Sequence, residues 1–421
     1  MFAISRRPRA PRYSARPVAG GLLRVVASPP LRALAALAIL AILATSAGPG
    51  AAEEPARIVL AYLSQIVERP PKISNLDLPP EDEGFAGGRL SIADNNTTGR
   101  FLGQEFVLEE VSVPPDGDAV AAFAELVENG VQFVILDVPA DRLLEMADSV
   151  ADQDVLLFNA GASDDRLRNA DCRDNVMHFA PSRAMLADAL AQYLAWKRWG
   201  EWFLIVGQRD GDQAFAEAIR RAAQRFGAEI VADRAWDYGP DARRTAQAEV
   251  PAFTQGVDHD ILIVADEIGE FGEYLAYRTW LPRPIAGSQG LTPTTWHRTH
   301  EQWGAAQLQS RFRKAYGRWM TPLDYQVWAP VRAVGEAATR TKSNDFAAIR
   351  DYLQGPDFEL AGFKGQKLTF RPWNWQLRQP ILLAAPRALV SVSPQEGFLH
   401  ERSLLDTLGY DAPESGCEIQ S

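Results

Sequence analysis

The sequence predicts an α/β protein that builds two successive parallel sheets, each covered by helices on both faces. Short apolar, β-rich runs alternate with amphipathic helical stretches through most of the chain. The runs are almost continuously apolar, as strands buried on both faces usually are. The 421-residue chain also exceeds what one hydrophobic core normally serves, so two domains are expected.

The first β-α array lies in the N-terminal half of the chain. Phe85, Leu90 and Ile92 are the apolar positions of its first helix, and Gly130 ends its second. Its strands are predicted at 57–64, 106–113, 132–138 and 155–159, and its helices at 83–95, 119–129 and 141–151.

A second array of similar length follows, without sequence repetition. Gly227 ends its second helix. Helices are predicted at 182–198, 213–226, within 241–255 and at 269–279, and strands at 202–207, 229–235, 260–265 and from 284 to 286. Two arrays of apolar strands separated by helices predict two parallel sheets.

The last third of the chain differs from the two arrays in composition and in predicted secondary structure. It is first helical and rich in tryptophan, with Trp296, Trp303, Trp319 and Trp328, and then β-rich at 367–371 and 381–392. The final residues, 394–421, are polar with a few apolar anchors. We interpret them as a C-terminal arm that lies over the surface.

Residues 1–52 have the composition of a secretory signal peptide. Seven arginines and no acidic residue precede Glu53, and an apolar run at 34–44 leads to small residues. The run is too short for an ordinary membrane-spanning helix. Cleavage is expected after Ala47 or Ala52, and a retained N-terminal anchor is the alternative.

The charge balance argues against nucleic acid as a partner. The full sequence has a formal net charge of −11, and a chain that starts at Glu53 is seven units more negative. Nucleic-acid binding needs a basic footprint. We therefore expect no nucleic-acid partner, and no stable membrane insertion of the exported chain.

Cys172 and Cys417 are the only cysteines. An even count in an exported chain predicts one disulfide between them, which would tether the C-terminal arm. Two free buried thiols are the alternative. The absence of CxxC spacing argues against thiol redox chemistry and a zinc knuckle.

The order and spacing of several segments resemble the type I periplasmic solute-binding proteins of ABC transporters, particularly the branched-chain amino-acid group. The resemblance runs from Arg57 to about Leu389 and includes VENGVQFVILDVPADRL, EWFLIVGQRDGDQAFAEAIRRAAQRFGAEIV and DHDILIVADEIGEFGEYL. It implies a periplasmic location, a small-molecule ligand, a membrane permease as partner, and no catalytic activity or cofactor.

Three further segments resemble a narrower subgroup, the solute-binding proteins encoded beside dehydrogenases that use pyrroloquinoline quinone (PQQ) to oxidise alcohols. The segments are LSQIVERPP, IADNNTTGRFLGQEF and FLHERSLLDTLG. This resemblance makes a periplasmic PQQ-dependent alcohol dehydrogenase a candidate partner. It does not name the ligand.

The resemblance implies two Rossmann-like lobes joined by three crossovers, so that each lobe is discontinuous in sequence. Lobe one is expected at 53–180 plus 293–361, and lobe two at 181–292 plus 362–393. The ligand is expected at the carboxyl ends of the strands, where loops of both lobes face each other.

Amino-acid-binding members of the family hold the ligand carboxylate with hydroxyls and backbone amides of the first lobe. The hydroxyl after the third strand falls on Ala140, which has none. In the next loop Ser163 falls where the family has a threonine. The amides of Gly161 and Ser163 could serve an anion or a carbonyl.

The second lobe of such members supplies a carboxylate for the ligand ammonium and aromatic lid residues. Here the lid positions fall on Gly211 and Glu267, and the carboxylate position falls on Gln289. A neutral amide cannot offset the cost of desolvating an ammonium. Glu267 and Asp266 could restore acidic character, but an unmodified branched-chain amino acid is not the expected ligand.

Uncharged hydroxylated or aromatic small molecules fit these positions better. Gln65, Asp137, Asn159 and Gln289 could hydrogen-bond such groups, and Trp328 is the best candidate for an aromatic contact. For most tryptophans, packing in the core or on a lobe surface is the expected role.

Motifs for catalysis or metal binding are weak. His297, His300 and Glu301 could lie on one helical face, but no further ligand is evident, and a solvated helix face is the favoured interpretation. Gly84-x-x-Gly87-Gly88 does not follow a strand and predicts no dinucleotide. We expect no metal. Two functions remain open: solute capture for a transporter, and a sensor or interaction module that partners a periplasmic dehydrogenase or receptor.

Overall fold

A computed structural model describes residues 55–68, 79–237 and 242–419. The predicted signal peptide, residues 1–52, lies outside the described residues. The first described sheet is parallel, with five strands in the order β2-β1-β3-β4-β5. Its strands are β1 (Ala56–Gln65), β2 (Gln104–Val113), β3 (Phe133–Asp137), β4 (Leu156–Asn159) and β5 (Val176–His178).

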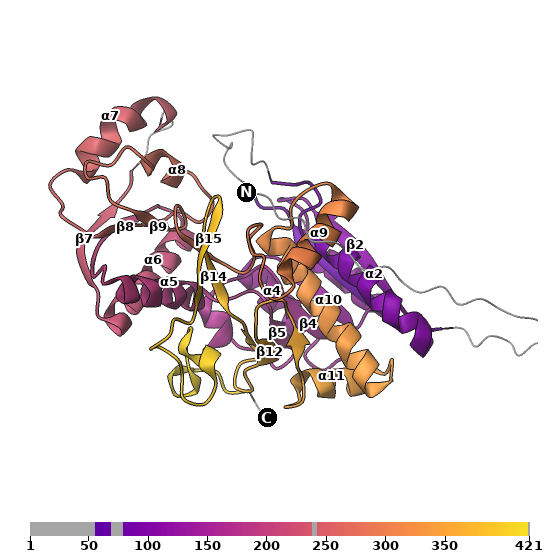
Figure 1. Ribbon diagram of the computed structural model, residues 1–421. Coiled ribbons are helices and arrows are strands. Elements are labelled where there is room, and N and C mark those ends of the chain that lie inside the picture. The colour runs from indigo at the N-terminus through magenta and orange to yellow at the C-terminus, as the bar shows by residue number, and fades with distance from the viewer. Residues whose placement is uncertain (1–54, 69–78, 238–241, 420–421) are drawn as a thin grey trace, which may run out of the picture. The chain divides into compact units, whose positions relative to one another are not determined.

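Both faces of this sheet are buried, because successive side chains of each apolar strand point to opposite faces. On one face Leu60, Tyr62 and Ile135 pack in a hydrophobic core with four helices. These are α2 (Phe85–Leu102), α9 (Ala305–Tyr316), α10 (Pro322–Thr341) and α11 (Phe346–Gln354). In Figure 1, α2 and α10 lie beside each other on this face. On the other face Leu63 and Leu136 pack against α3 (Ala119–Glu128) and α4 (Ala140–Ser149).

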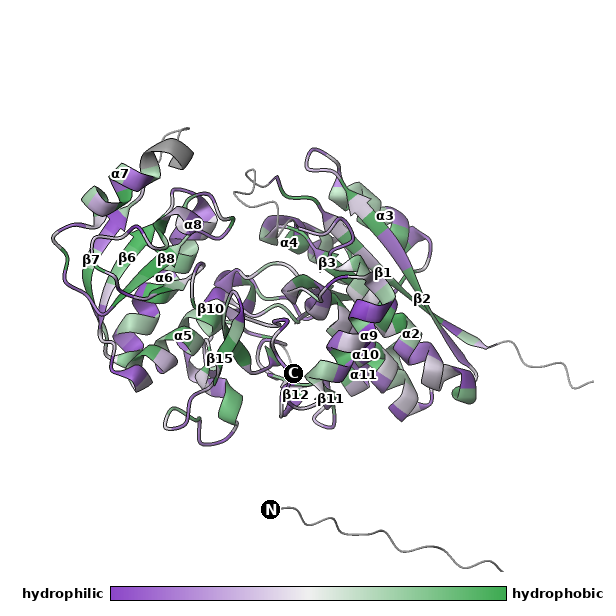
Figure 2. Cartoon of the chain, turned by 45° about the horizontal axis from the view of Figure 1, so that its top comes forward, coloured by the Kyte–Doolittle hydropathy of each residue, from purple (hydrophilic) through white to green (hydrophobic). Residues whose placement is uncertain are grey.

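The second parallel sheet has four strands in the order β7-β6-β8-β9. They are β6 (Glu201–Val206), β7 (Glu229–Ala235), β8 (Ile261–Ala265) and β9 (Ile285–Gly287). Figure 2 shows β6 and β8 as strongly hydrophobic. One face packs on α5 (Arg183–Lys197) and α6 (Asp210–Phe226), and the other on α7 (Ala242–Thr254) and α8 (Gly272–Leu275). We call the first sheet with its helices the first lobe, and the second sheet with its helices the second lobe.

The α/β class and the two parallel sheets predicted from the sequence are confirmed. The predicted helix at 269–279 is wrong in length, because only Gly272–Leu275 is helical. The chain before it is instead wrapped around Asp266, whose carboxylate accepts hydrogen bonds from the amides of Gly269, Glu270, Phe271 and Gly272. Tyr277, at φ 65°, lies beyond its end.

The interpretation of His297, His300 and Glu301 as a solvated helix face is also wrong. These residues precede α9 and lie outside any helix. His300 is fully buried, and its Nε2–H donates to the Phe363 carbonyl at 2.8 Å. Among the described residues, no group of three or more His, Cys, Asp or Glu side chains is placed to hold a metal ion.

Two small antiparallel sheets, β11-β12-β13 and β10-β14-β15, lie near the crossovers between the lobes. Leu368, Phe370 and Leu377 pack in the first lobe's core, whereas Ile381 and Leu383 pack in that of the second. The last crossover therefore follows Leu377, later than the sequence-based boundary at 362. The strands of these two small sheets are β10 (Thr292–Thr294), β11 (Leu360–Ala361), β12 (Lys367–Phe370), β13 (Leu377–Arg378), β14 (Ile381–Ala385) and β15 (Ala388–Ser393).

The C-terminal arm, 394–421, is described as far as residue 419. It contains two short 3-10 helices, η2 (Leu404–Thr407) and η3 (Ala412–Glu414), and Leu408 is buried in the second lobe's core. The predicted disulfide between Cys172 and Cys417 is present, with the Cα atoms 5.7 Å apart. Cys172 follows η1 (Asp165–Arg168) in the first lobe.

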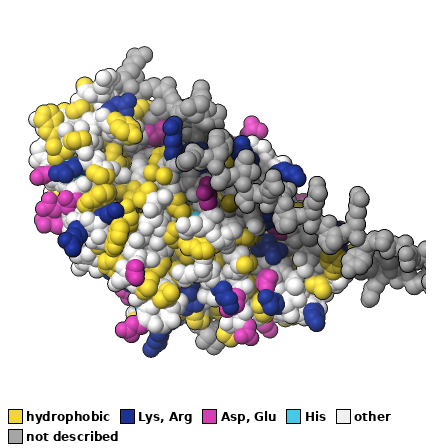
Figure 3. Space-filling model, viewed as in Figure 1, with side chains coloured by type: hydrophobic (Ala, Val, Ile, Leu, Met, Phe, Trp, Pro, Cys, Tyr) yellow, Lys and Arg dark blue, Asp and Glu magenta, His cyan; other side chains and the backbone are white. Residues whose placement is uncertain are grey.

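None of the helices in the described part of the chain has the length and apolar character that crossing a membrane requires. On the face shown in Figure 3, basic and acidic side chains are interspersed over the described residues.

Candidate functional site

A cavity of about 630 Å³ lies where loops of the two lobes meet. The first lobe contributes the loops that follow β3 and β4, and the second lobe contributes those that follow β8 and β9. Carboxyl ends of parallel strands are where α/β folds place ligands, and the volume suits a small molecule. Six of the residues predicted from the sequence line this cavity: Asp137, Ala140, Gly161, Ser163, Glu267 and Gln289.

The loop after β4, residues 160–164, is called the cleft loop below. Asn159, at the end of β4, holds it: its side-chain amide donates to the Ala162 carbonyl at 2.8 Å, and its oxygen accepts from the Ala162 amide at 2.9 Å. Gly161 approaches Asp137 so closely that a Cβ would lie 2.1 Å from Asp137 Oδ1. Ser163 is thereby brought to the cavity wall, and its carbonyl accepts from the Arg183 amide.

Asp137 ends β3 and lies beside this loop. Its carboxylate accepts hydrogen bonds from the hydroxyls of Ser64 at 2.9 Å and Tyr62 at 3.4 Å. Burial, and then the charge of Asp137, raise the pKa of Tyr62 well above its usual value, so its hydroxyl stays protonated and can donate. Ala140 starts α4 at the cavity wall and offers only a methyl group.

Arg183 is a cleft residue that the sequence did not reveal. Its guanidinium pairs with both oxygens of Glu267 at 2.8 Å and with Asp164 at 3.1 Å. Burial lowers the pKa of Arg183, but the hydrogen bond and charge of Glu267 outweigh it and leave the pKa raised. Glu267 and Asp164 come from different lobes, so this arginine joins the loops across the cleft. No local sequence pattern signals it.

Asp266 and Glu267 of the second lobe do not have the role expected from the sequence, which was to give the cleft acidic character. Asp266 is 1% exposed and is occupied by the four amides of the loop that follows it, so it does not line the cavity. Glu267 lines the cavity but is already paired with Arg183. Gly211 lies behind this pair, because a Cβ there would come 2.6 Å from Glu267 Oε2. The acidic character expected from Asp266 and Glu267 is therefore largely neutralised.

Three other predicted residues lie away from the cavity wall. Trp328 is 1% exposed and stacks on Tyr325 in the core of the first lobe. Asn159 is fully buried and supports the cleft loop from behind. Gln65 lies in a separate surface hollow, where its amide donates to the carbonyls of Pro115 and Gly117. Phe215 supplies the one aromatic ring among the described residues that line the cavity.

His178 supports Asn159 behind the cleft loop. It is buried, and its Nδ1 accepts from the Asn159 amide at 3.0 Å, which requires a neutral ring. Burial, reinforced by the charge of Arg168, lowers the pKa of His178 well below its usual value. The unfolded chain therefore binds a proton near pH 6.5 that the folded chain does not. The resulting stability is present above that pH and is lost as the pH falls.

We expect the unfolding free energy to fall between pH 6.5 and 5, with up to about 1.4 kcal/mol per pH unit coming from His178. Denaturant titrations at several pH values measure this slope. His178→Gln, which cannot titrate, should flatten it relative to the unsubstituted protein. Equal slopes in the two proteins would show that His178 is not the cause.

Comparisons with known proteins agree with this architecture. Residues 84–250 match the family model of the periplasmic binding proteins. No curated protein sequence matches the chain. Among solved structures, a branched-chain amino acid ABC transporter periplasmic ligand-binding protein from Burkholderia xenovorans LB400 is similar, with a TM-score of 0.66 at 16% identity. That match covers 86% of this chain and 99% of the other.

Two more structures extend the likeness. The leucine-, isoleucine-, valine-, threonine- and alanine-binding protein from Brucella ovis, in a closed conformation, has a TM-score of 0.67 at 14% identity, covering 86% of this chain and 99% of its own. A solute-binding protein of an ABC transporter from Rhodopseudomonas palustris BisB5, in complex with 3,4-dihydroxybenzoic acid, has a TM-score of 0.56 at 13% identity, covering 78% and 93%. The chain has the periplasmic binding protein type I fold.

Proposed function

We propose that this chain is the periplasmic solute-binding component of an ABC transporter and captures a small molecule in the cleft. The observation that carries the proposal is the convergence of four strand-end loops, two from each lobe, on one cavity of about 630 Å³. A ligand there contacts both lobes at once, so its binding energy can drive hinge closure. The partner is then a membrane permease that recognises the liganded form.

The ligand is a small hydroxylated molecule rather than an unmodified branched-chain amino acid. Ser163, Asp137 and Gln289 offer hydrogen-bonding groups at the wall. A ligand ammonium would have to compete with Arg183 for Glu267, and would meet an amide at Gln289. The Rhodopseudomonas palustris protein holds a hydroxylated benzoic acid, which supports this class of ligand. Phe215 is the one aromatic ring among the described lining residues, so ring stacking on a ligand is limited to that side chain.

We further propose that the ligand belongs to a system that contains a PQQ-dependent alcohol dehydrogenase. The support is the resemblance of three segments of the sequence, 63–71, 92–106 and 398–409. An alcohol would supply a hydroxyl group for the hydrogen-bonding side chains at the cleft wall.

A thermal-shift screen of the exported protein tests the proposal. Candidate ligands are alcohols, organic acids, amines, aromatics and quinone cofactors, because a ligand that binds only the folded state raises the melting temperature. A hit at micromolar concentration supports solute capture. Stabilisation by none of these classes would favour the sensor or interaction module instead.

The hit then tests the site. Ser163→Ala and Gln289→Ala are each expected to weaken its binding by about 1–3 kcal/mol, since each leaves a buried ligand group without a partner. Ser149→Ala and Gln153→Ala are matched controls, because both residues are exposed, Ser149 at the end of α4 and Gln153 in the turn that follows. Isothermal titration calorimetry measures all four. Unchanged affinity in both cleft variants would place the site elsewhere.

Leucine, isoleucine and valine are expected not to bind at micromolar concentration. The clamp for an amino-acid zwitterion lacks a hydroxyl at Ala140 and a carboxylate at Gln289, and Glu267 is paired with Arg183. Calorimetric titration with each amino acid tests this. A micromolar dissociation constant for any of the three would refute the assignment of the ligand class.

A further inference from the structure

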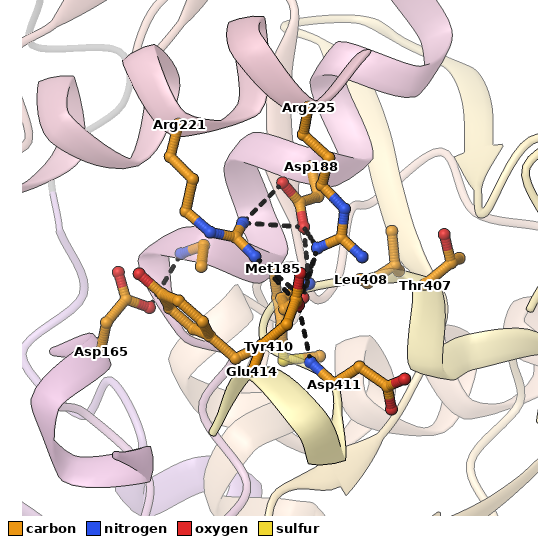
Figure 4. A network of polar contacts seen from close by, with 12 residues as sticks. Asp165, Met185, Asp188, Arg221, Arg225, Thr407, Leu408, Tyr410, Asp411 and Glu414 are labelled. Atoms are coloured by element: carbon orange, nitrogen blue, oxygen red, sulfur yellow. Dashed lines mark hydrogen bonds and ion pairs between the residues drawn. The ribbon is translucent and has the colours of Figure 1, made fainter. Parts of the chain in front are cut away.

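The segment 404–417 of the C-terminal arm, called the strap below, contacts both lobes. Its grip on the second lobe is centred on Asp188 of α5, which is fully buried (Figure 4). The Gly409 amide donates to Asp188 Oδ2 at 2.8 Å, and Arg225 donates to the Gly409 carbonyl at 2.8 Å. Arg221 and Arg225 of α6 also pair with Asp188 at 3.1 Å. The strap thus closes a polar network between α5 and α6.

Apolar and ring contacts strengthen the same grip. Leu408 is buried in the second lobe's core. The Arg221 guanidinium lies 4.1 Å from the centre of the Tyr410 ring, and these two side chains lie against each other in Figure 4. Gly409 has φ 82°, and a Cβ there would come 2.8 Å from Met185 Cγ. The strap can lie this close to α5 only with glycine at that position.

A second set of contacts holds the strap near its start, at Asp406 and Leu408. Arg371, which follows β12 and is 1% exposed, pairs with Asp406 at 3.0 Å and donates to the Leu408 carbonyl at 2.6 Å. Arg378 pairs with the same carboxylate at 2.7 Å. Arg371 directly follows β12 and Arg378 lies in β13, in the β11-β12-β13 sheet whose apolar residues pack in the first lobe.

The third grip is on η1, directly after the cleft loop. Cys417 is bonded to Cys172. Ser415 Oγ donates to the Arg168 carbonyl at 3.2 Å, and the Gly416 amide donates to Asn169 Oδ1 at 3.4 Å. The strap is therefore fixed to the backbone of the residue that holds the cleft loop.

Arg168 holds the cleft loop with its guanidinium. It is 2% exposed and donates to the carbonyls of Ala162 at 2.9 Å and Asp164 at 3.0 Å. It also donates to the Ala180 carbonyl at 2.7 Å and to Gln376 Oε1 at 2.9 Å, which joins both neighbouring crossovers. One buried guanidinium thus donates both to the two carbonyls of the cleft loop and to residues at the crossovers between the lobes.

We propose that the strap and Arg168 form a positioning device that holds the cleft loop of the first lobe in register with α5 and α6 of the second. The importance of this loop for ligand binding rests on the proposed function. Because the strap is held on both lobes, loss of its contacts with α5 and α6 or of its contacts with η1 frees η1 to move, and the cleft loop moves with it. Arg168 is a positioning residue, since it lies outside the described cavity lining and acts through the loop backbone.

Hydrogen exchange followed by mass spectrometry tests the device without any ligand. One variant, Cys172→Ser/Cys417→Ser, releases the grip on η1. A second, Gly409→Ala, disturbs the grip on α5 and leaves the disulfide intact. Gly416→Ala is the matched control, because its Cβ would meet its nearest neighbour, the Ala170 amide nitrogen, at 3.9 Å, an ordinary contact. Exchange in β6 and β8 reports whether each variant is folded.

Cys172→Ser/Cys417→Ser and Gly409→Ala are each expected to raise amide hydrogen exchange about tenfold in peptides covering 404–417 and also in those covering 160–171. The control variant should leave exchange in both regions unchanged. Unchanged exchange at 160–171 in either folded variant overturns the proposal, because the strap would then stabilise only its own contacts and would not position the cleft loop. The readout needs no ligand, so failure of the solute-binding proposal in the thermal-shift screen leaves this result interpretable. Ligand binding with unaltered exchange would refute the positioning device alone.

Discussion

Removal of the Cys172–Cys417 disulfide is expected to lower the unfolding free energy by about 5 kcal/mol. The two cysteines are 245 residues apart, so the bridge closes a very long loop and removes much conformational entropy from the unfolded chain. Denaturant unfolding of Cys172→Ser/Cys417→Ser against the oxidised protein measures the loss.

The reduced and alkylated wild-type protein is the control for the two serine substitutions, and it should unfold at the same denaturant concentration as the variant. If the variant and the oxidised protein share one midpoint, the arm is held by packing and ion pairs alone. Peptide mapping under non-reducing conditions should recover Cys172 and Cys417 in one linked pair.

Replacement of Arg168 by methionine is expected to cost about 3–5 kcal/mol of unfolding free energy. The substitution removes one donor from each of three carbonyls and from the Gln376 oxygen. The Ala162 and Ala180 carbonyls keep a second buried donor, from Asn159 and Gln376. Burial lowers the pKa of Arg168 to about 10, so the lost group is still a charged donor at neutral pH.

Arg166→Met is the matched control for this substitution. Arg166 lies on the same short helix, but its side chain is 42% exposed and pairs with Asp141 and Asp171 at the surface. Exposed pairs contribute little, so the expected loss is at most about 1 kcal/mol. Thermal and denaturant unfolding of both variants compare the two. Equal losses of unfolding free energy in the two variants would mean that the buried hydrogen bonds of Arg168 stabilise the fold no more than the exposed ion pairs of Arg166.

Most of the fold was predictable because each parallel strand has apolar side chains on both faces. Strand β7 lies at 229–235, where the sequence placed it, and β1, β2 and β8 differ by one or two residues at their ends. Short strands such as β5 and β13 were missed, because their residues depend on tertiary partners: His178 lies in a bridge with Gln376, far away in sequence. Helix α8 was overestimated because a single carboxylate, that of Asp266, organises the chain before it.

The candidate site was predictable in position but only partly in its roles. Strand ends located Asp137, Ser163 and Gln289, because parallel strands deliver their carboxyl ends to one edge. They could not tell whether a polar residue faces the cavity or supports a loop, as Asn159 and Asp266 do. Arg183 starts a helix, and only the tertiary fold brings Glu267 and Asp164 to it. Trp328 looked like a cleft residue by analogy, and its burial in the core could not be read from local sequence.

The pairing of Arg183 with Glu267 also restricts how this cleft could change its ligand during evolution. A larger side chain at Gly211 would meet Glu267 Oε2 at 2.6 Å while both oxygens of that carboxylate are held by Arg183. An aromatic ring could enter at position 211 only if Glu267 were replaced first. That replacement alone would leave the two guanidinium nitrogens of Arg183 that pair with Glu267 without a partner in a partly buried site. Each single step is unfavourable, so the change requires substitutions that arise together. Descendants of this chain are therefore expected to keep or lose glycine 211, glutamate 267 and arginine 183 as a set.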